Sequence, residues 1–376
     1  MVPSIGMHEV TVSPAAAALR EALGTAGAGL IERDVLVELI GLAAVAGEHV
    51  LVIGPPGTAK SQAVRRVAQV LGGRYFEYLI GRFTEPNEIF GPVDLRKLKD
   101  GVVEIETTGM LPEADVAFLD EVFLGSTAIL NTLLQILNER TFRRGRTQLA
   151  VPLRVCVGAS NVLPDAPELA AFADRFLVRV FVDPLEDARL EELLASQAPP
   201  VSTGSRLAAL DELSAAAKRV ELGGVRDLYA QAVRTLRKRG IALTDRRLVR
   251  AQRLVAAAAA LAGRSAASAA DLWPLVAAVP RRDEQAAARE ALAPLLAESE
   301  NRALGAAAAE LSLGPLARAA RIVADGEALL VGDAADEAWR LKVEGVAREI
   351  DATFAPDRVP EAVAVLRRRI VDRLAT

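Results

Sequence analysis

Short apolar runs in the first half of the chain predict buried strands, and amphipathic stretches between them predict helices. The clearest apolar runs are residues 50–53, 116–119, 155–158 and 176–182, and a shorter strand is expected at residues 75–79. Helices are expected over residues 14–46, 60–71 and 126–139, and Ser126 can cap the last of them. Strands that alternate with helices favour a parallel sheet with helices on both faces.

The pattern changes after residue 195. Residues 195–204 are rich in Ala, Ser, Pro and Gly and predict a linker. Beyond the linker the pattern is almost entirely helical, with a second break near Pro280. We therefore expect an α/β unit over residues 1–195 and helical units over residues 203–280 and 286–376.

Composition narrows the class of protein. The chain has 376 residues, with 45 Lys and Arg against 49 Asp and Glu, and 51% hydrophobic residues, which is typical of a globular protein. A single cysteine, Cys156, excludes an internal disulfide, and two histidines argue against a metal site built on Cys or His. No apolar run reaches the roughly 18–20 residues of a membrane span, and residues 1–10 lack the features of a signal peptide. A cytoplasmic protein is expected.

A glycine-rich segment between a predicted strand and a predicted helix is a candidate phosphate-binding loop. Its residues are Gly54, Pro55, Pro56, Gly57, Thr58, Ala59, Lys60 and Ser61, followed by Gln62 in the helix. Glycines let backbone N–H groups turn toward phosphates, and the helix N-terminus adds partial positive charge. Lys60 would reach the outer phosphates and the Ser61 hydroxyl would ligate Mg²⁺. The strict pattern has Gly where this chain has Ala59, and a turn with an incidental lysine is the alternative interpretation.

Polar residues follow two further predicted strands. Asp120 and Glu121 come directly after residues 116–119, and Asn161 follows the strand that begins near residue 155. Asp120 is expected to hold the metal, and Glu121 to polarise the attacking water. Asn161 is placed to hold that water or to sense the γ-phosphate. Two acids in a turn, or an Asn at a strand end, are common by themselves, but they gain meaning beside a phosphate-binding loop in one sheet.

Together these motifs resemble the AAA+ ATPases, and the form of residues 54–61 resembles the MoxR branch. Residues 82–92, 128–142 and 243–247 are further similar to the RavA subgroup, and the resemblance covers about residues 30–275. It implies a three-layer α/β/α P-loop core with a parallel sheet, followed by an all-α lid and a C-terminal helical domain. In this branch Ala before the lysine is normal.

The resemblance also implies roles for residues outside the loop. Arg175 matches the arginine finger, which would act on the nucleotide of a neighbouring subunit, and Arg246 matches the lid arginine called sensor 2, with Arg247 as the alternative. Residues 93–112 match an insert within helix 2, and residues 143–153 match the hairpin before sensor 1. Residues 300–376 are too short to hold the β-rich module of RavA.

The resemblance predicts an ATP- and Mg²⁺-dependent homo-oligomeric ring, expected to be a hexamer. It would remodel a protein client together with a von Willebrand factor A (vWA) domain partner. Two alternatives stay open: a nucleotide-switched assembly scaffold with little turnover, and a nucleic-acid motor. The complete set of Asp120, Glu121, Asn161 and Arg175 argues against a scaffold, and the lack of an aromatic and basic binding stripe argues against nucleic acid.

Overall fold

The computed structural model describes residues 13–185, 190–195, 199–201, 204–313, 319, 322–323, 326–330, 337–354 and 359–374. Residues 1–10, in which no signal peptide is expected, and parts of the predicted linker lie outside the described residues.

A five-stranded parallel sheet forms the centre of the first unit, with strand order β2-β3-β6-β1-β7. Its strands are β1 (Val50–Ile53), β2 (Tyr75–Leu79), β3 (Val116–Asp120), β6 (Val155–Ser160) and β7 (Val178–Phe181). All five lie where the sequence predicts strands, although β7 begins two residues later than expected. The predicted fold class, a parallel α/β sheet followed by helices, is confirmed.

Helices cover both faces of this sheet. Successive residues of a strand point to opposite faces, so each face packs its own set of side chains against helices. Val50 and Val52 enter a core with α1 (Pro14–Gly27), α2 (Asp34–Ala46) and α3 (Lys60–Leu71). Leu51 and Ile53 enter a second core with α6 (Thr127–Glu139), which Ser126 caps. Shorter elements complete the unit: α4 (Pro86–Phe90), α5 (Leu95–Lys99), β4 (Thr141–Arg144), β5 (Thr147–Ala150) and α7 (Pro167–Ala173), with single turns at Leu111–Glu113 and Val122–Leu124.

The helices of the second half extend the first of these cores. They are α9 (Leu207–Ala217), α10 (Arg226–Lys238), α11 (Asp245–Leu261), α12 (Pro274–Ala277), α13 (Arg282–Leu296) and α14 (Gly305–Leu313), with turns at Gly223–Val225 and Ala269–Asp271. The predicted boundary at residue 286 falls inside α13. The unit boundaries stay predictions, but the side chains of α13 and α14 pack into the same core as those of α11.

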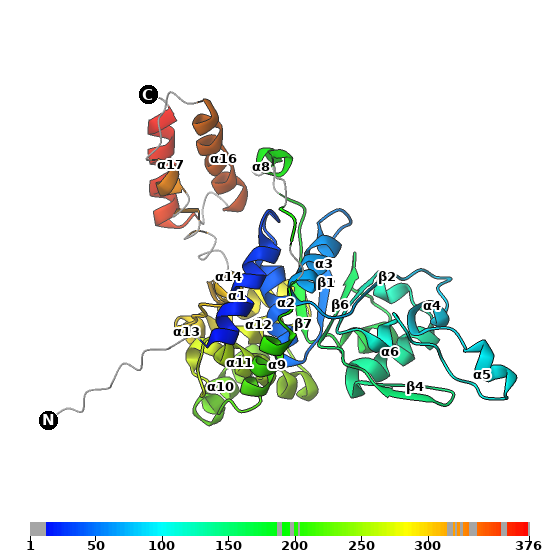
Figure 1. The fold of residues 1–376 in the computed structure, drawn as a ribbon. Helices are drawn as coiled ribbons and strands as arrows, with labels where there is room; N and C mark the ends of the chain where they lie inside the picture. The colour runs from blue at the N-terminus through cyan, green and yellow to red at the C-terminus, as the bar shows by residue number, and fades with distance from the viewer. Residues whose placement is uncertain are drawn as a thin grey trace.

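A small separate core lies near the C-terminus. Trp339, Val343, Ile350, Leu366 and Ile370 of α16 (Glu337–Thr353) and α17 (Glu361–Leu374) pack together. In Figure 1 these two helices stand side by side, away from the sheet, with α8 (Leu190–Ala195) next to α16. At the opposite side of Figure 1, α5 and β4 project beyond the sheet.

Candidate nucleotide site

The loop between β1 and α3 carries the lysine that the sequence singles out. Lys60 is the first residue of α3, and its Nζ donates to the carbonyl oxygens of Gly54 at 2.6 Å and Pro55 at 2.8 Å. The Thr58 hydroxyl donates to the Pro55 carbonyl at 2.9 Å, which closes the loop on itself. The ammonium group of Lys60 therefore lies inside the curve of the loop.

Two residues of this loop have positive φ angles. Gly57 has φ +80° and Ala59 has φ +57°, with Ala59 immediately before α3. This left-handed conformation is easy for glycine and unfavourable for other residues. Alanine takes the position where the strict motif has glycine, and the backbone still makes the same turn.

Arg33 connects the loop to two other segments, and sequence reasoning missed it. Its Nε donates to the Thr58 carbonyl at 2.9 Å, and its Nη2 donates to the Asp183 carbonyl at 2.8 Å, just beyond β7. Burial lowers the pKa of Arg33, while the charges of Glu32 and Asp183 oppose that shift. No local motif marks this residue, because its partners lie far away in the sequence.

Asp120, Glu121 and Asn161 lie at the same edge of the sheet as the loop. The Asn161 Nδ2 donates to Glu121 Oε1 at 2.6 Å, although the residues are 40 positions apart. Glu121 has φ +50°, and its backbone N–H donates to Asp120 Oδ1 at 3.0 Å. Burial lowers the pKa of Lys60, and the charges of Asp120 and Glu121 oppose that shift, so all three charged groups share one site.

The donor set fits Mg²⁺ bound together with a nucleotide. Ser61 and Gln62 occupy the first turn of α3, with Ser61 half-buried and Gln62 exposed. Within the described part of the chain, no group of three or more His, Cys, Asp or Glu residues could hold a metal ion. One hydroxyl and one carboxylate suit Mg²⁺, which usually takes its other ligands from phosphates and water.

The two predicted arginines lie at the opposite edge of the sheet. Arg175 precedes β7, whose first residue, Val178, pairs with Val50 at the start of β1, whereas Lys60 follows the end of β1. The Arg246 Nη2 donates to Asn138 Oδ1 at 2.6 Å, at the C-terminal end of α6. Burial, followed by the charges of Arg175 and Arg250, lowers the pKa of Arg246. Arg175 and Arg246 therefore belong to one cluster, which is separate from Lys60.

Arg247, the alternative to Arg246, has no free guanidinium to offer a ligand. Its side chain is 2% exposed and forms an ion pair with Asp174 at 3.0 Å. Its Nε and Nη2 donate to the Ala278 carbonyl at 2.9 and 2.8 Å. Of the two candidates, only Arg246 is exposed.

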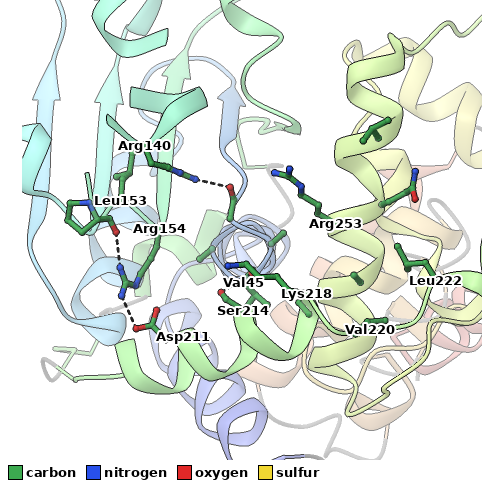
Figure 2. Close-up of a pocket in the computed structure, with 18 of the residues that line it drawn as sticks. Val45, Arg140, Leu153, Arg154, Asp211, Ser214, Lys218, Val220, Leu222 and Arg253 are labelled. Carbon is green, nitrogen blue, oxygen red and sulfur yellow. Dashed lines mark hydrogen bonds and ion pairs between the residues drawn. The ribbon is translucent and has the colours of Figure 1, made fainter. Parts of the chain in front are cut away.

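A cavity of about 620 Å³ lies near the N-terminal ends of β1 and β6, between the end of α2 and helices α9 and α11. Figure 2 shows Arg140 and Arg253 pointing toward each other from opposite sides of it. Arg140 donates to the Gly47 carbonyl at 2.7 Å, and burial lowers its pKa to about 10. Gly47 precedes β1 and Arg154, which also lines the cavity, precedes β6, so the cavity is distinct from the phosphate-loop edge.

This combination of fold and site defines a P-loop ATPase of the AAA+ class. Residues 17–211 match the family described as the MoxR domain in the MoxR-vWA-beta-propeller ternary systems. The chain belongs to this family of MoxR AAA+ ATPases. The finer RavA-like assignment is not tested by these matches and stays a prediction.

Relatives and a solved structure agree with this assignment. The uncharacterized protein MJ0812 of Methanocaldococcus jannaschii is 36% identical over 247 residues, which cover 64% of this chain and 66% of that protein. Chaperone MoxR1 of Mycobacterium tuberculosis is 27% identical over 162 residues, 41% of each chain. The chain thus spans just under two thirds of MJ0812 and less of MoxR1.

The fold matches a crystal structure described as a candidate ATPase from Cytophaga hutchinsonii. The TM-score is 0.59 at 16% identity, with 76% of this chain and 96% of that chain covered. In the described residues, no helix combines the length and apolarity that crossing a bilayer requires.

Proposed function

We propose that this chain binds ATP with Mg²⁺ at the edge formed by Lys60, Asp120, Glu121 and Asn161, and hydrolyses it. The observation that carries the proposal is the Glu121–Asn161 hydrogen bond of 2.6 Å at the edge that Lys60 also occupies. It joins the ends of two strands from distant parts of the sequence. A carboxylate held by an amide next to a phosphate-binding lysine suits the activation of water.

Each residue of the proposed nucleotide site has a distinct role. The N–H groups of the loop from Gly54 to Ala59 and the start of α3 bind phosphate oxygens, and Lys60 neutralises the outer phosphates. Ser61 and Asp120 hold Mg²⁺, which would offset the negative charge of the phosphates. Glu121 accepts a proton from the attacking water, and Asn161 orients either that water or Glu121 itself.

We assign Arg175 and Arg246 to the nucleotide of a neighbouring subunit in a ring, which we expect to be a hexamer. Both residues lie beyond the N-terminal end of β1, and β1 alone spans about 13 Å. This separation supports action in trans, because Arg175 lies at the opposite ends of the strands from its own Lys60. A guanidinium that reaches the γ-phosphate can accelerate phosphoryl transfer by about 10³–10⁵-fold.

The partner proposal rests on the family. The matching family is named for systems that combine MoxR with vWA and β-propeller components, which supports a vWA-domain partner for this chain. MoxR1, a relative, is called a chaperone. We therefore propose that hydrolysis drives the remodelling of a protein client.

The test compares Lys60→Ala with Glu121→Gln. Lys60→Ala removes the phosphate contact, so ATP binding measured by calorimetry should weaken and turnover should disappear. Glu121→Gln keeps the hydrogen bond to Asn161 but removes the base, so ATP should bind with near wild-type affinity while kcat falls by at least about 10²-fold. Phosphate release measures kcat, and circular dichroism verifies folding.

Two results would contradict the proposal. Unchanged ATP affinity in Lys60→Ala would remove Lys60 from the site. Turnover of the wild type no higher than that of Glu121→Gln would favour the nucleotide-switched scaffold instead.

A further inference from the structure

The segment between α7 and β7, which contains Arg175, is held by arginine side chains. Each of the five consecutive carbonyl oxygens from Ala173 to Leu177 accepts a hydrogen bond from a guanidinium group. Arg179 donates to Ala173 at 2.5 Å, Arg250 to Arg175 at 3.1 Å, and Arg247 to Asp174 at 3.4 Å, Phe176 at 3.4 Å and Leu177 at 2.6 Å. Residues 174–177 lie between α7 and β7, so their carbonyls have no partners in the helix or the sheet ladder, and the Ala173 carbonyl also accepts the Phe176 N–H at 3.1 Å.

Two of these arginines come from the lid helix α11. Arg247 and Arg250 are three positions apart, so they extend from the same face of the helix. Arg247 also pairs with the Asp174 carboxylate at 3.0 Å, and Arg250 pairs with the fully buried Glu48. Hydrogen bonds from charged donors are stronger than those between neutral groups, and burial raises the penalty for breaking them. The backbone of residues 174–177 is therefore fixed to α11.

The backbone of Arg175 is hydrogen-bonded, whereas the Nε of its side chain has no partner among the described residues. Its N–H donates to the Phe172 carbonyl at 3.0 Å, and its carbonyl accepts from Arg250. The next residue, Phe176, is fully buried, with ring centroids 5.7 Å from Phe172 and 6.3 Å from His49. The backbone at Arg175 is thus held firmly, while its buried Nε has no hydrogen-bond partner in the described part of the chain.

We propose that Arg247 and Arg250 are positioning residues that fix Arg175 to the lid helix, so that Arg175 and Arg246 reach a neighbour's nucleotide as one unit. Arg246 belongs to this unit because it directly precedes Arg247 in α11. The inference rests on the proposed function, in which Arg175 acts in trans. It adds that the orientation of α11 sets the position of Arg175, the proposed arginine finger. This follows because α11 provides Arg246 and also Arg247 and Arg250, which donate hydrogen bonds to residues 174–177.

The experiment compares Arg250→Gln with Arg253→Gln. Both residues form an ion pair with Glu48, but only Arg250 also contacts the Arg175 carbonyl. Arg250→Gln should lower kcat by about 10- to 100-fold, the usual effect of misplacing a reacting group, with little change in the KM for ATP. Arg253→Gln should have near wild-type kcat.

Rings that mix two variants show whether Arg250→Gln misplaces Arg175 or damages the whole subunit. A ring of Arg250→Gln and Lys60→Ala subunits should regain activity, because the Lys60→Ala subunit provides an intact finger to the intact site of its neighbour. A ring of Arg250→Gln and Arg175→Ala subunits should be no more active than Arg250→Gln alone, because neither subunit provides a well-placed Arg175. Rescue of Arg250→Gln by Arg175→Ala, or a rise in KM without a fall in kcat, would overturn the inference.

Amide hydrogen exchange tests the same contact without any ATPase activity. The N–H groups of Arg175 and Phe176, which donate to Phe172 and Ala173, should exchange faster in Arg250→Gln than in Arg253→Gln. If Arg250→Gln folds poorly, Arg247→Lys replaces it in this test. Lysine keeps the positive charge but lacks the planar guanidinium group that donates several hydrogen bonds, so the same faster exchange is expected. Unchanged exchange in both variants would overturn the inference.

A separate experiment tests the trans role of Arg175, on which the inference rests. Rings that mix Lys60→Ala with Arg175→Ala subunits should recover activity, and no recovery although mixed rings form would show that this role is wrong. The exchange measurement would still decide whether Arg250 holds residues 174–177.

Discussion

At the scale of single residues, two residues of the nucleotide site other than glycine have left-handed backbone conformations. Ala59 has φ +57° and Glu121 has φ +50°. For residues other than glycine this conformation costs roughly 1–2 kcal/mol, and such positions concentrate where function requires a particular direction of the chain. At Ala59 the backbone must turn into α3 so that the loop can close around Lys60. At Glu121 it turns the side chain toward Asn161.

Ala59→Val tests this strain. A β-branched side chain fits the left-handed conformation poorly, so the free energy of unfolding should fall by about 1–2 kcal/mol. Ala208→Val is the control, because Ala208 is exposed in the ordinary helix α9 and should lose only about 0.5 kcal/mol. Urea titrations followed by circular dichroism give both values. Equal losses at the two positions would mean that Ala59 stores no strain.

At the scale of elements, a carboxylate of one helix caps another. Glu38 of α2 accepts a hydrogen bond from the Ala307 N–H at 2.7 Å, in the first turn of α14. Burial raises the pKa of Glu38 to about 7, although hydrogen bonds from the backbone of Ala307 and Ala306 oppose the shift. The contact joins α14 to the α/β unit, and its protonation state changes near neutral pH.

Glu38→Gln should remove a pH dependence of stability. The folded protein keeps the Glu38 proton up to a pKa of about 7, whereas the unfolded chain releases it near 4.5, so this contribution is complete below pH 4.5 and is lost as the pH rises through 7. Between pH 4.5 and 8 the wild type should lose at most about 3 kcal/mol relative to Glu38→Gln, measured by urea unfolding. Glu21→Gln, at an exposed position of α1, is the control and should follow the wild type. Parallel pH profiles of wild type and Glu38→Gln would contradict this explanation.

At the scale of the whole molecule, the predicted insert and the predicted hairpin form one projecting unit. The hairpin is β4 and β5, somewhat earlier than the expected residues 143–153. The Arg146 N–H donates to the Val103 carbonyl at 2.9 Å, and the Ile105 N–H donates to the Thr147 hydroxyl at 2.7 Å. The unit lies at the end of the molecule beyond β2 (Figure 1). We expect its exposed cations to bind an acidic partner or client surface; they are Arg96, Lys97, Lys99, Arg143, Arg144 and Arg146.

Charge reversal tests this surface. The variant changes Arg143, Arg144 and Arg146 to Glu. The control changes Arg219, Lys238 and Arg239, which are also exposed and lie in or next to α9 and α10, to Glu. Only the first variant should weaken binding of the vWA-domain partner or client in pull-down and interferometry, and neither should change ATP affinity. Equal effects of the two triple variants would remove the projecting unit from the interface. Tight binding of single-stranded DNA by the wild type with steep salt dependence would favour the nucleic-acid motor.

The sequence by itself determined those features whose physical cause is local. The apolar run at β1, the loop up to Lys60, the helix that Ser126 caps and the strand that ends at Asp120 all follow from hydrophobic periodicity and from residues a few positions apart. Because carboxyl ends of parallel strands meet at one edge, the sequence also brought Lys60, Asp120 and Asn161 to one site. Their roles stay predictions that the proposed variants test.

Only the tertiary structure decided what depends on contacts across the chain. Arg246 and Arg247 are neighbours with the same chemistry, yet one is exposed and the other is 2% exposed, because their directions on α11 differ. The role of Arg33 depends on the carbonyls of Thr58 and Asp183, which only the packed fold brings within reach. Likewise, β7 begins at Val178 rather than two residues earlier. The carbonyls before it accept hydrogen bonds from lid arginines some 70 residues later in the sequence, and no local pattern encodes such a partner.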